Sequence, residues 1–114
     1  MGTNYYAVRN RPTVRKPIHI GKSSGGWKFL FAAQRDIYGD PPLEWNTYNQ
    51  VRDWLKKYTV DSKDYVIMDE YDDEISFDDF FAMVERKQKE EGNKEEFLYC
   101  RNVDGYRFED GEFW

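Results

Sequence analysis

The side chains best suited to chemistry lie together in one short glycine-rich segment. It holds the only histidine of the chain, a lysine, two serines and three glycines. A histidine can act as a general base for a serine, and a lysine with successive backbone amides can hold a phosphate or a carboxylate. A tight hairpin whose hydroxyls bond their own backbone explains the same residues without a ligand, and both interpretations stay open. The candidate ligand-binding residues are His19, Gly21, Lys22, Ser23, Ser24, Gly25, Gly26 and Trp27.

The order Gly21-Lys22-Ser23 resembles the end of a phosphate-binding P-loop. The earlier glycine of that motif would fall at Lys16, and the chain continues into a strand-like segment at Trp27 where a P-loop continues into a helix. The sequence therefore does not indicate a nucleotide hydrolase, and no catalytic residue is assigned. Binding of a small anionic ligand by this segment remains the alternative hypothesis, with hydrolysis as its extension.

A second candidate site is a block of acidic residues around one tyrosine. A calcium loop is excluded because the third position of the block is a tyrosine and the sixth is not a glycine. A dense negative surface can imitate nucleic-acid phosphates or dock on a basic groove of a protein, with the tyrosine as an anchor. A solvated hairpin turn explains the same residues without a partner. The candidate partner-binding residues are Asp69, Glu70, Tyr71, Asp72, Asp73 and Glu74.

Charge is distributed unevenly along the chain. Residues 1–60 carry 10 basic and 4 acidic side chains, a net of +6, whereas residues 61–80 carry 1 and 9, a net of −8. The whole chain has a formal net charge of −5. Phosphate contacts need clustered lysine and arginine, so direct binding to duplex DNA is not expected. Charge asymmetry of this kind favours docking to another macromolecule over catalysis.

Length and composition predict one domain covering residues 1–114. A single cysteine, Cys100, cannot form an internal disulfide, and one cysteine with one histidine cannot supply a structural zinc site. We predict no metal and no cofactor. The N-terminal residues lack a signal-peptide pattern and no apolar run reaches the length of a membrane span. We therefore expect a soluble, cytoplasmic protein without membrane contact.

The elements that must position these residues follow from apolar spacing and turn residues. Thr47 with Gln50 matches a capping box at the start of one helix, and Ser76 caps a second helix. We expect the loop 34–46 to lack regular structure because of its two prolines. A turn at residues 72–73 is expected to reverse the strand 64–69 through residues 74–75. Strands are predicted at residues 3–9, 17–21, 27–33, 64–69, 97–101 and 106–108, the last two as a hairpin around residues 104–105.

The predicted fold class is α+β, with a mostly antiparallel sheet of about six short strands in the order β-β-β-α-β-α-β-β and two helices packed on it. A hairpin should close at residues 23–26, and one more turn should follow at residues 110–111. Strand alternation places His19 on the same face as Gly21 and Ser23, opposite Ile18 and Ile20. The expected buried side chains are Trp27, Phe29 and Phe31 in the third strand, Tyr48, Val51, Trp54, Leu55 and Tyr58 in the first helix, and Phe77, Phe80, Phe81 and Val84 in the second.

Four sequence blocks resemble a group of small uncharacterised proteins encoded by bacteriophages and prophages. The blocks are residues 1–6 (MGTNYY), 19–27 (HIGKSSGGW), 69–71 (DEY), and 103–108 (VDGYRF) with 111–113 (GEF), so the match spans most of the chain. Many members of the group carry a Cys-x-x-Cys pair before the second block, but residues 10–17 here contain no cysteine. The resemblance implies a phage origin and the cytoplasm of a bacterial host, with no established activity and no metal site carried over.

Two functional hypotheses follow. The leading one is a non-enzymatic phage accessory protein that binds a host or phage macromolecule, for example as an inhibitor of a defence or nucleic-acid enzyme that docks on the acidic block. The alternative is a module that binds or hydrolyses a small ligand or phosphate at residues 19–27.

Overall fold

The computed structural model describes residues 2–10, 16–25, 28–39, 41–89, 101–103 and 105–110. Its helices are α1 (Tyr48–Leu55), which continues as the π-helix η1 (Lys56–Asp61), and α2 (Phe77–Lys87). Its strands are β1 (Gly2–Arg9), β2 (Ile18–Ser24), β3 (Leu30–Asp36), β4 (Leu43–Trp45), β5 (Tyr65–Asp69), β6 (Glu74–Ile75), β7 (Arg101–Val103) and β8 (Tyr106–Asp110).

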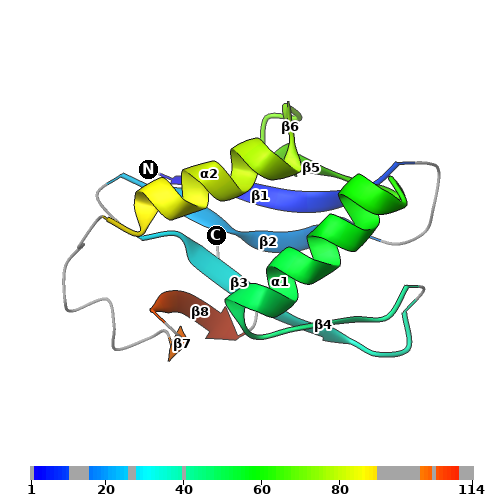
Figure 1. Ribbon diagram of the computed structural model, residues 1–114, viewed down its shortest axis with the longest axis horizontal. Helices are drawn as coiled ribbons and strands as arrows, with labels where there is room; N and C mark the ends of the chain where they lie inside the picture. The colour runs from blue at the N-terminus through cyan, green and yellow to red at the C-terminus, as the bar shows by residue number, and fades with distance from the viewer. Residues whose placement is uncertain are drawn as a thin grey trace.

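The described strands form one sheet in the order β6-β5-β1-β2-β3-β8-β7, with β4 paired to β3 beside this path (Figure 1). Neighbouring strands run antiparallel except β3 and β8, which run parallel. Strand β1 is therefore an interior strand of the sheet, between β2 and β5. This arrangement brings the acidic block, at the end of β5, close to the glycine-rich segment in β2, although the two are far apart in the sequence.

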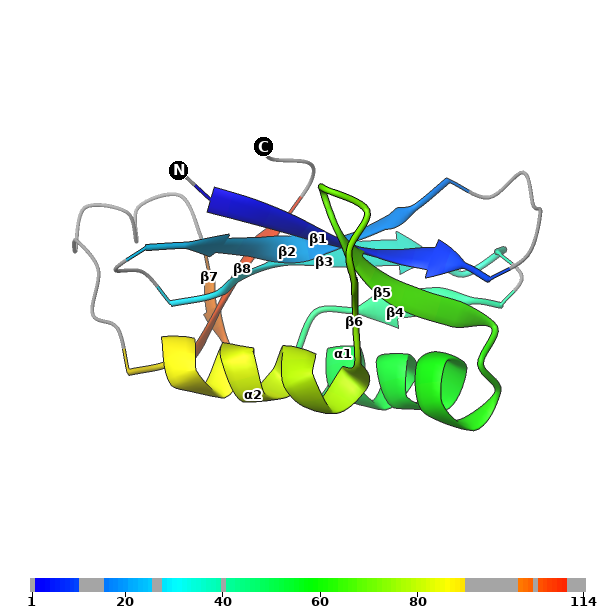
Figure 2. The same ribbon diagram turned by 90° about the horizontal axis from the view of Figure 1, so that it is seen from above.

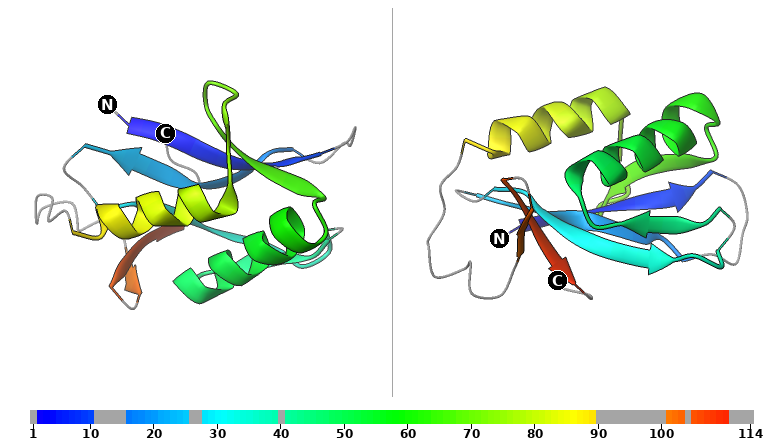
Figure 3. Two further views of the ribbon diagram at one scale, coloured as in Figure 1. Left: turned by 45° about the horizontal axis from the view of Figure 1, so that its top comes forward. Right: turned by 60° about the horizontal axis from the view of Figure 1, so that its bottom comes forward.

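The molecule has two layers. Figure 2 shows α1 and α2 side by side on one face of the sheet, and the same layering is visible in the two views of Figure 3. No helix among the described residues covers the other face, which we call the open face. The predicted α+β class, with helices packed on a mostly antiparallel sheet, is confirmed.

Both predicted helix starts are confirmed, and each has a local cause. The Thr47 hydroxyl accepts a hydrogen bond from the Gln50 backbone N–H at 3.2 Å, and the Ser76 hydroxyl accepts one from the Asp79 N–H at 3.1 Å. Each bond satisfies a backbone donor that the first turn of a helix leaves unpaired. Asp78 and Asp79 also lie in the first turn of α2, where the helix dipole favours negative charge.

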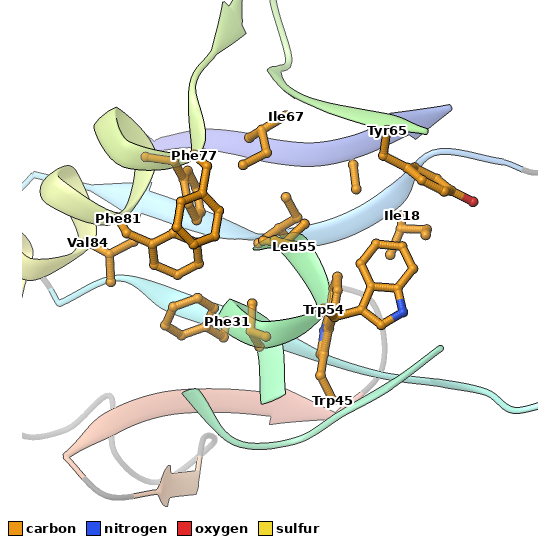
Figure 4. Packing of buried hydrophobic residues seen from close by; sticks show 14 of the residues in the cluster. Ile18, Phe31, Trp45, Trp54, Leu55, Tyr65, Ile67, Phe77, Phe81 and Val84 are labelled. Carbon is orange, nitrogen blue, oxygen red and sulfur yellow. The ribbon is translucent and has the colours of Figure 1, made fainter. Parts of the chain in front are cut away.

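The core fills the space between the helices and the sheet (Figure 4). Aromatic rings supply much of it, as shown by the Phe29 ring, which lies 5.4 Å from Phe80 and 4.7 Å from Phe31 between centroids. Each fully buried side chain of this size contributes about 1.5–3 kcal/mol through loss of water contact. The predicted helix residues are confirmed as core or as half-buried neighbours of it: Tyr48, Val51, Trp54, Leu55, Tyr58, Phe77, Phe80, Phe81 and Val84. Trp27 lies outside the described residues.

Several predicted boundaries were wrong. The segment 34–46 was expected to lack regular structure, but β3 extends to Asp36 and β4 begins at Leu43. Strand β4 forms a short antiparallel hairpin with the end of β3, in which Asp36 pairs with Leu43, so the two prolines interrupt the strands only between these residues. The predicted hairpin between β2 and β3 is confirmed, since their last described pair is Lys22 with Leu30 and the connection begins at Ser23, although β2 continues along β1 through Ser24. Residues 97–100 and 111–114, parts of the predicted final strand and turn, lie outside the described residues.

A β-bulge reverses one prediction about faces. Tyr5 pairs with Gly21 and the next residue, Tyr6, pairs with His19, so Ile20 is an extra residue on β2. Cross-strand partners share a face, while consecutive residues of β1 point to opposite faces. His19 therefore lies on the open face and Gly21 faces the core. The expectation that both lie on one face is wrong because simple alternation does not survive a bulge.

Candidate functional site

The glycine-rich segment is mostly strand. Gly21, Lys22, Ser23 and Ser24 belong to β2 and are paired with β1, and Gly25 follows in a turn. A nest for an anion needs successive amides that point to one place, whereas the amides of a strand point alternately to its two edges. The backbone of residues 21–24 is therefore used for pairing. Gly26 and Trp27, the other members of this candidate site, lie outside the described residues.

Gly21 has a structural reason to be a glycine. A Cβ atom at this position would lie 2.4 Å from Cε2 of Phe29 and 2.3 Å from the carbonyl oxygen of Leu30. Both distances are shorter than any ordinary van der Waals contact, so a side chain there would push apart β2, β3 and the core ring. By contrast, a Cβ at Gly25 would meet nothing within 4 Å. The close approach that the glycine permits is made by the protein's own aromatic ring.

The bulge also separates the reactive groups. Ser23 lies on the core side with Gly21, two positions away in the strand, whereas His19 lies on the open face. Ser24 lies on the open face but five positions from His19, roughly 16 Å at the usual strand rise. Neither serine is therefore placed to give its proton to His19 within the described structure.

His19 is instead part of a polar chain that runs through the buried Asn4 to the exposed Glu70. The Asn4 backbone N–H and side-chain Nδ2 donate to the same Glu70 oxygen, Oε1, at 2.8 and 3.4 Å. On the other side, Asn4 Oδ1 lies 2.9 Å from His19 Nε2. Because an amide oxygen only accepts, His19 donates through Nε2. Asn4 and His19 are 7% and 6% exposed, so these bonds satisfy groups that would be costly to bury alone.

Tyr6 completes the surroundings of His19 on the open face. The two rings stack with centroids 5.2 Å apart and an interplanar angle of 29°. Gln34 Nε2 donates to the His19 carbonyl oxygen at 2.9 Å. The histidine is thus held at its ring face, its ring nitrogen and its backbone.

The acidic block forms the turn between β5 and β6, and Asp69 organises it. Asp69 Oδ1 accepts the backbone N–H groups of Tyr71 and Asp73 at 2.8 and 3.0 Å. Its backbone accepts the N–H of Asp72 at 3.2 Å, and Asp72 has a positive φ of 65°. This is an aspartate turn, in which a short side chain replaces backbone partners. Asp69 is thereby explained by local structure, and Glu70 is explained by its bonds to Asn4.

The remaining members of the block, Tyr71, Asp72, Asp73 and Glu74, form what we call the acidic tip. All four are exposed, and Tyr71 retains 65% of its accessible surface. The turn that carries them projects past the sheet edge in Figure 1 and rises on the open-face side in Figure 2.

The charges of the acidic tip are not neutralised by described residues. No lysine or arginine of the described ranges forms an ion pair with these carboxylates, and the surface pair Arg35–Glu44, at 3.3 Å, lies elsewhere on β3 and β4. Within the same ranges, no three histidine, cysteine, aspartate or glutamate side chains gather closely enough to hold a metal ion. As far as the described residues go, the acidic tip therefore carries exposed negative charge without a basic partner.

Neither Asn4 nor a second cluster, which joins α1, α2 and β8, was predicted from the sequence. Tyr48 from α1 and Tyr106 from β8 stack with ring centroids 3.9 Å apart and an angle of 5°. Both hydroxyls donate to Glu85 Oε1 of α2, each at 2.7 Å. Burial first, and then the bond to Glu85 and its negative charge, raise the pKa of Tyr106 to about 12, against a smaller lowering by Tyr48. The same causes raise the pKa of Tyr48.

This second cluster joins three elements. Next to it, Gln88 Nε2 donates to the Gly105 carbonyl oxygen at 3.0 Å, and the Lys87 ammonium donates to the Ser24 carbonyl oxygen. All of these contacts fasten the end of α2 to the sheet. We assign the cluster a structural role, since its contacts join α1, α2 and β8.

No helix in the described part of the chain is long and apolar enough to cross a membrane. No family model matches the sequence, and neither a curated protein nor a solved structure matches it significantly.

Proposed function

We propose that this chain is a non-enzymatic binding protein that captures a host or phage protein by docking the acidic tip on a basic surface. The observation that carries the proposal is the acidic tip itself, which projects from the sheet with three carboxylates that no described lysine or arginine neutralises. Leaving these charges unpaired contributes nothing to folding, because exposed charges gain little from one another.

Electrostatics supports a protein partner with a basic groove. Three like charges on one turn raise the rate of encounter with a positive surface and discourage negative partners. Nucleic acid and anionic lipid are repelled by the same charges. A protein that itself binds nucleic acid has the required basic groove, so a nucleic-acid or defence enzyme is the class of target that we propose.

Tyr71 supports the same proposal. It lies in the middle of the acidic tip and is 65% exposed, while its backbone is held by Asp69. Tyrosine contributes a large contact area with little loss of conformational freedom and is frequent among the residues that dominate binding energy. The resemblance to phage proteins also supports a host protein as the partner, because a phage protein acts inside a host cell.

The alternative at residues 19–27 receives less support. Residues 21–24 are paired with β1, His19 Nε2 is bonded to Asn4, and Ser23 faces away from His19. We therefore do not propose a hydrolase.

The experiment is capture from a bacterial lysate with three purified forms of the protein. The first is the wild type and the second carries Asp72→Asn with Asp73→Asn, a change that removes charge, keeps shape, and suits the positive φ at position 72. The third, the matched control, carries Asp53→Asn with Asp61→Asn, two exposed acidic residues on α1 and η1. Captured proteins are identified by mass spectrometry.

We expect at least one protein to be captured by the wild type and by the control variant but lost with the Asp72 and Asp73 variant. The same set of proteins on all three forms would overturn the proposal, since charge at the acidic tip would then have no role in capture. Loss with both variants would also overturn it, because net charge alone would account for binding.

A further inference from the structure

Four apolar side chains lie together on the open face of β1 and β5. The register pairs Tyr6 with Met68 and Val8 with Val66, so each pair sits directly across the two strands. We call these four residues the apolar patch. Their neighbours along the strands, Ala7 and Ile67, are at most 1% exposed and face the core. Alternation therefore directs the apolar patch away from both helices.

The apolar patch is not part of the core. The buried cluster and the half-buried side chains packed against it, as far as the described residues go, include none of its four members. All four are half-buried on the face that no described helix covers (Figure 2). An antiparallel sheet with one free face usually carries polar side chains there. Tyrosine, methionine and two valines in cross-strand pairs depart from that pattern and are typical of an interaction site.

The apolar patch is continuous with the acidic tip. Met68 pairs with Glu74 in β6, and Glu70 follows Met68 on the same face. The Glu70 carboxylate is held in place by its two bonds to Asn4. A partner that crosses the apolar patch toward β6 therefore meets fixed negative charge at its edge. In Figure 2 the turn after β5 rises on this same side of the sheet.

We infer that the apolar patch and the acidic tip form one docking surface for a protein segment in which apolar side chains stand beside lysine or arginine. This inference rests on the proposed function and extends it, because it adds the face of the sheet and states the chemistry of the partner. Contact with the apolar patch removes apolar surface from water, and the acidic tip selects lysine or arginine in the partner. Negative charge at the rim disfavours an anionic partner, and it places like charges together if two copies meet face to face.

The first test is selection from a random peptide library on the immobilised full chain. We expect the enriched peptides to combine lysine or arginine with aliphatic or aromatic residues. Enrichment of acidic or purely apolar peptides would overturn the inference, and so would the absence of enrichment. Enrichment of purely basic peptides would overturn the inference while leaving the proposed function standing.

One enriched peptide is then titrated against matched variants. Val66→Thr with Met68→Gln makes two of the four side chains of the apolar patch polar while nearly keeping their size. The control Val60→Thr makes the same kind of change on η1, at an apolar residue that is 44% exposed. We expect the double variant to weaken the peptide by about tenfold or more, as for central interface residues. The control should bind as the wild type does. Equal affinity of the double variant and the wild type would overturn the inference.

A measurement on the wild-type protein avoids any effect of substitution on folding. Met68 lies in the apolar patch, whereas Met83 of α2 packs against the core, so the two methyl groups report on opposite faces. With methyl-labelled methionine, the peptide should shift the NMR signal of Met68 and leave that of Met83 in place. Movement of Met83 alone, or of neither, would contradict the inference. The chain without peptide is also examined by sedimentation. If it forms a dimer that Met68→Gln dissociates, the open face binds a second copy of the chain, and the inference is overturned.

Discussion

Asn4 and Glu70, 66 positions apart in the sequence, meet through two hydrogen bonds to a single carboxylate oxygen. One bond comes from the Asn4 backbone and one from its side chain, so the glutamate is fixed in direction as well as in place. Through the 2.9 Å contact between Asn4 Oδ1 and His19 Nε2, the same asparagine connects the two regions that the sequence marks as candidate sites. Glu70, which directly precedes the acidic tip, is thus held in place by Asn4.

Replacement of Asn4 should therefore destabilise the fold. Asn4→Ala removes the side-chain bonds to Glu70 and His19 and leaves the His19 Nε2 donor without that partner, at a cost of about 1–3 kcal/mol in the free energy of unfolding. Urea denaturation measures this change. Asn10→Ala is the control, because Asn10 is exposed and its side chain makes a 3.3 Å bond to the Lys63 carbonyl oxygen. Equal losses for the two variants would show that the polar chain does not stabilise the fold.

An added methyl group should destabilise the protein at Gly21 but not at Gly25. Gly21→Ala places a Cβ 2.4 Å from the Phe29 ring and 2.3 Å from a backbone oxygen, and such overpacking costs about 1–3 kcal/mol. Gly25→Ala meets nothing within 4 Å and should leave the unfolding midpoint within error of the wild type. Thermal or urea unfolding of both variants measures these changes in stability. A stable Gly21→Ala protein would mean that the close contact between β2 and the Phe29 ring is absent.

High pH should weaken the fold through the tyrosine cluster. The pKa of Tyr106 is raised to about 12 in the folded protein, above the ordinary value of 10.0. The folded state thus holds this proton more tightly than the unfolded chain does. The stabilisation is complete below pH 10 and is lost as the pH rises from 10 toward 12. Unfolding in urea at a series of alkaline pH values should show stability falling across this window.

The variant Glu85→Gln tests the cause of that shift. It removes the negative charge near both phenols but leaves their burial, which is the largest cause. The phenolate absorbance of Tyr106 should then appear at lower pH than in the wild type, though still above the ordinary tyrosine value. An unchanged titration curve would indicate that Glu85 does not receive the two hydroxyl bonds.

Features with a local cause could be predicted from the sequence. Thr47 and Ser76 cap helices because their hydroxyls reach backbone groups three residues away. The apolar stripe of α2 follows from helical spacing, and it is buried as expected at Phe80 and Val84. These elements need no information about distant parts of the chain.

Features that depend on distant pairing could not be predicted. The bulge at Ile20 depends on the register between β1 and β2, and it decides which face His19 occupies. The Asn4–Glu70 contact requires β1 to lie beside β5. A single sequence contains no signal for such register, so the connection between the candidate sites came only from the folded arrangement.

The most direct test of the central claim is the association rate with the partner that lysate capture identifies, measured as a function of salt concentration. If the acidic tip steers docking, Asp72→Asn with Asp73→Asn should slow association by about tenfold or more at low salt and flatten its salt dependence. The control Asp53→Asn with Asp61→Asn should behave as the wild type does. An association rate and a salt dependence that are the same in all three proteins would contradict the account.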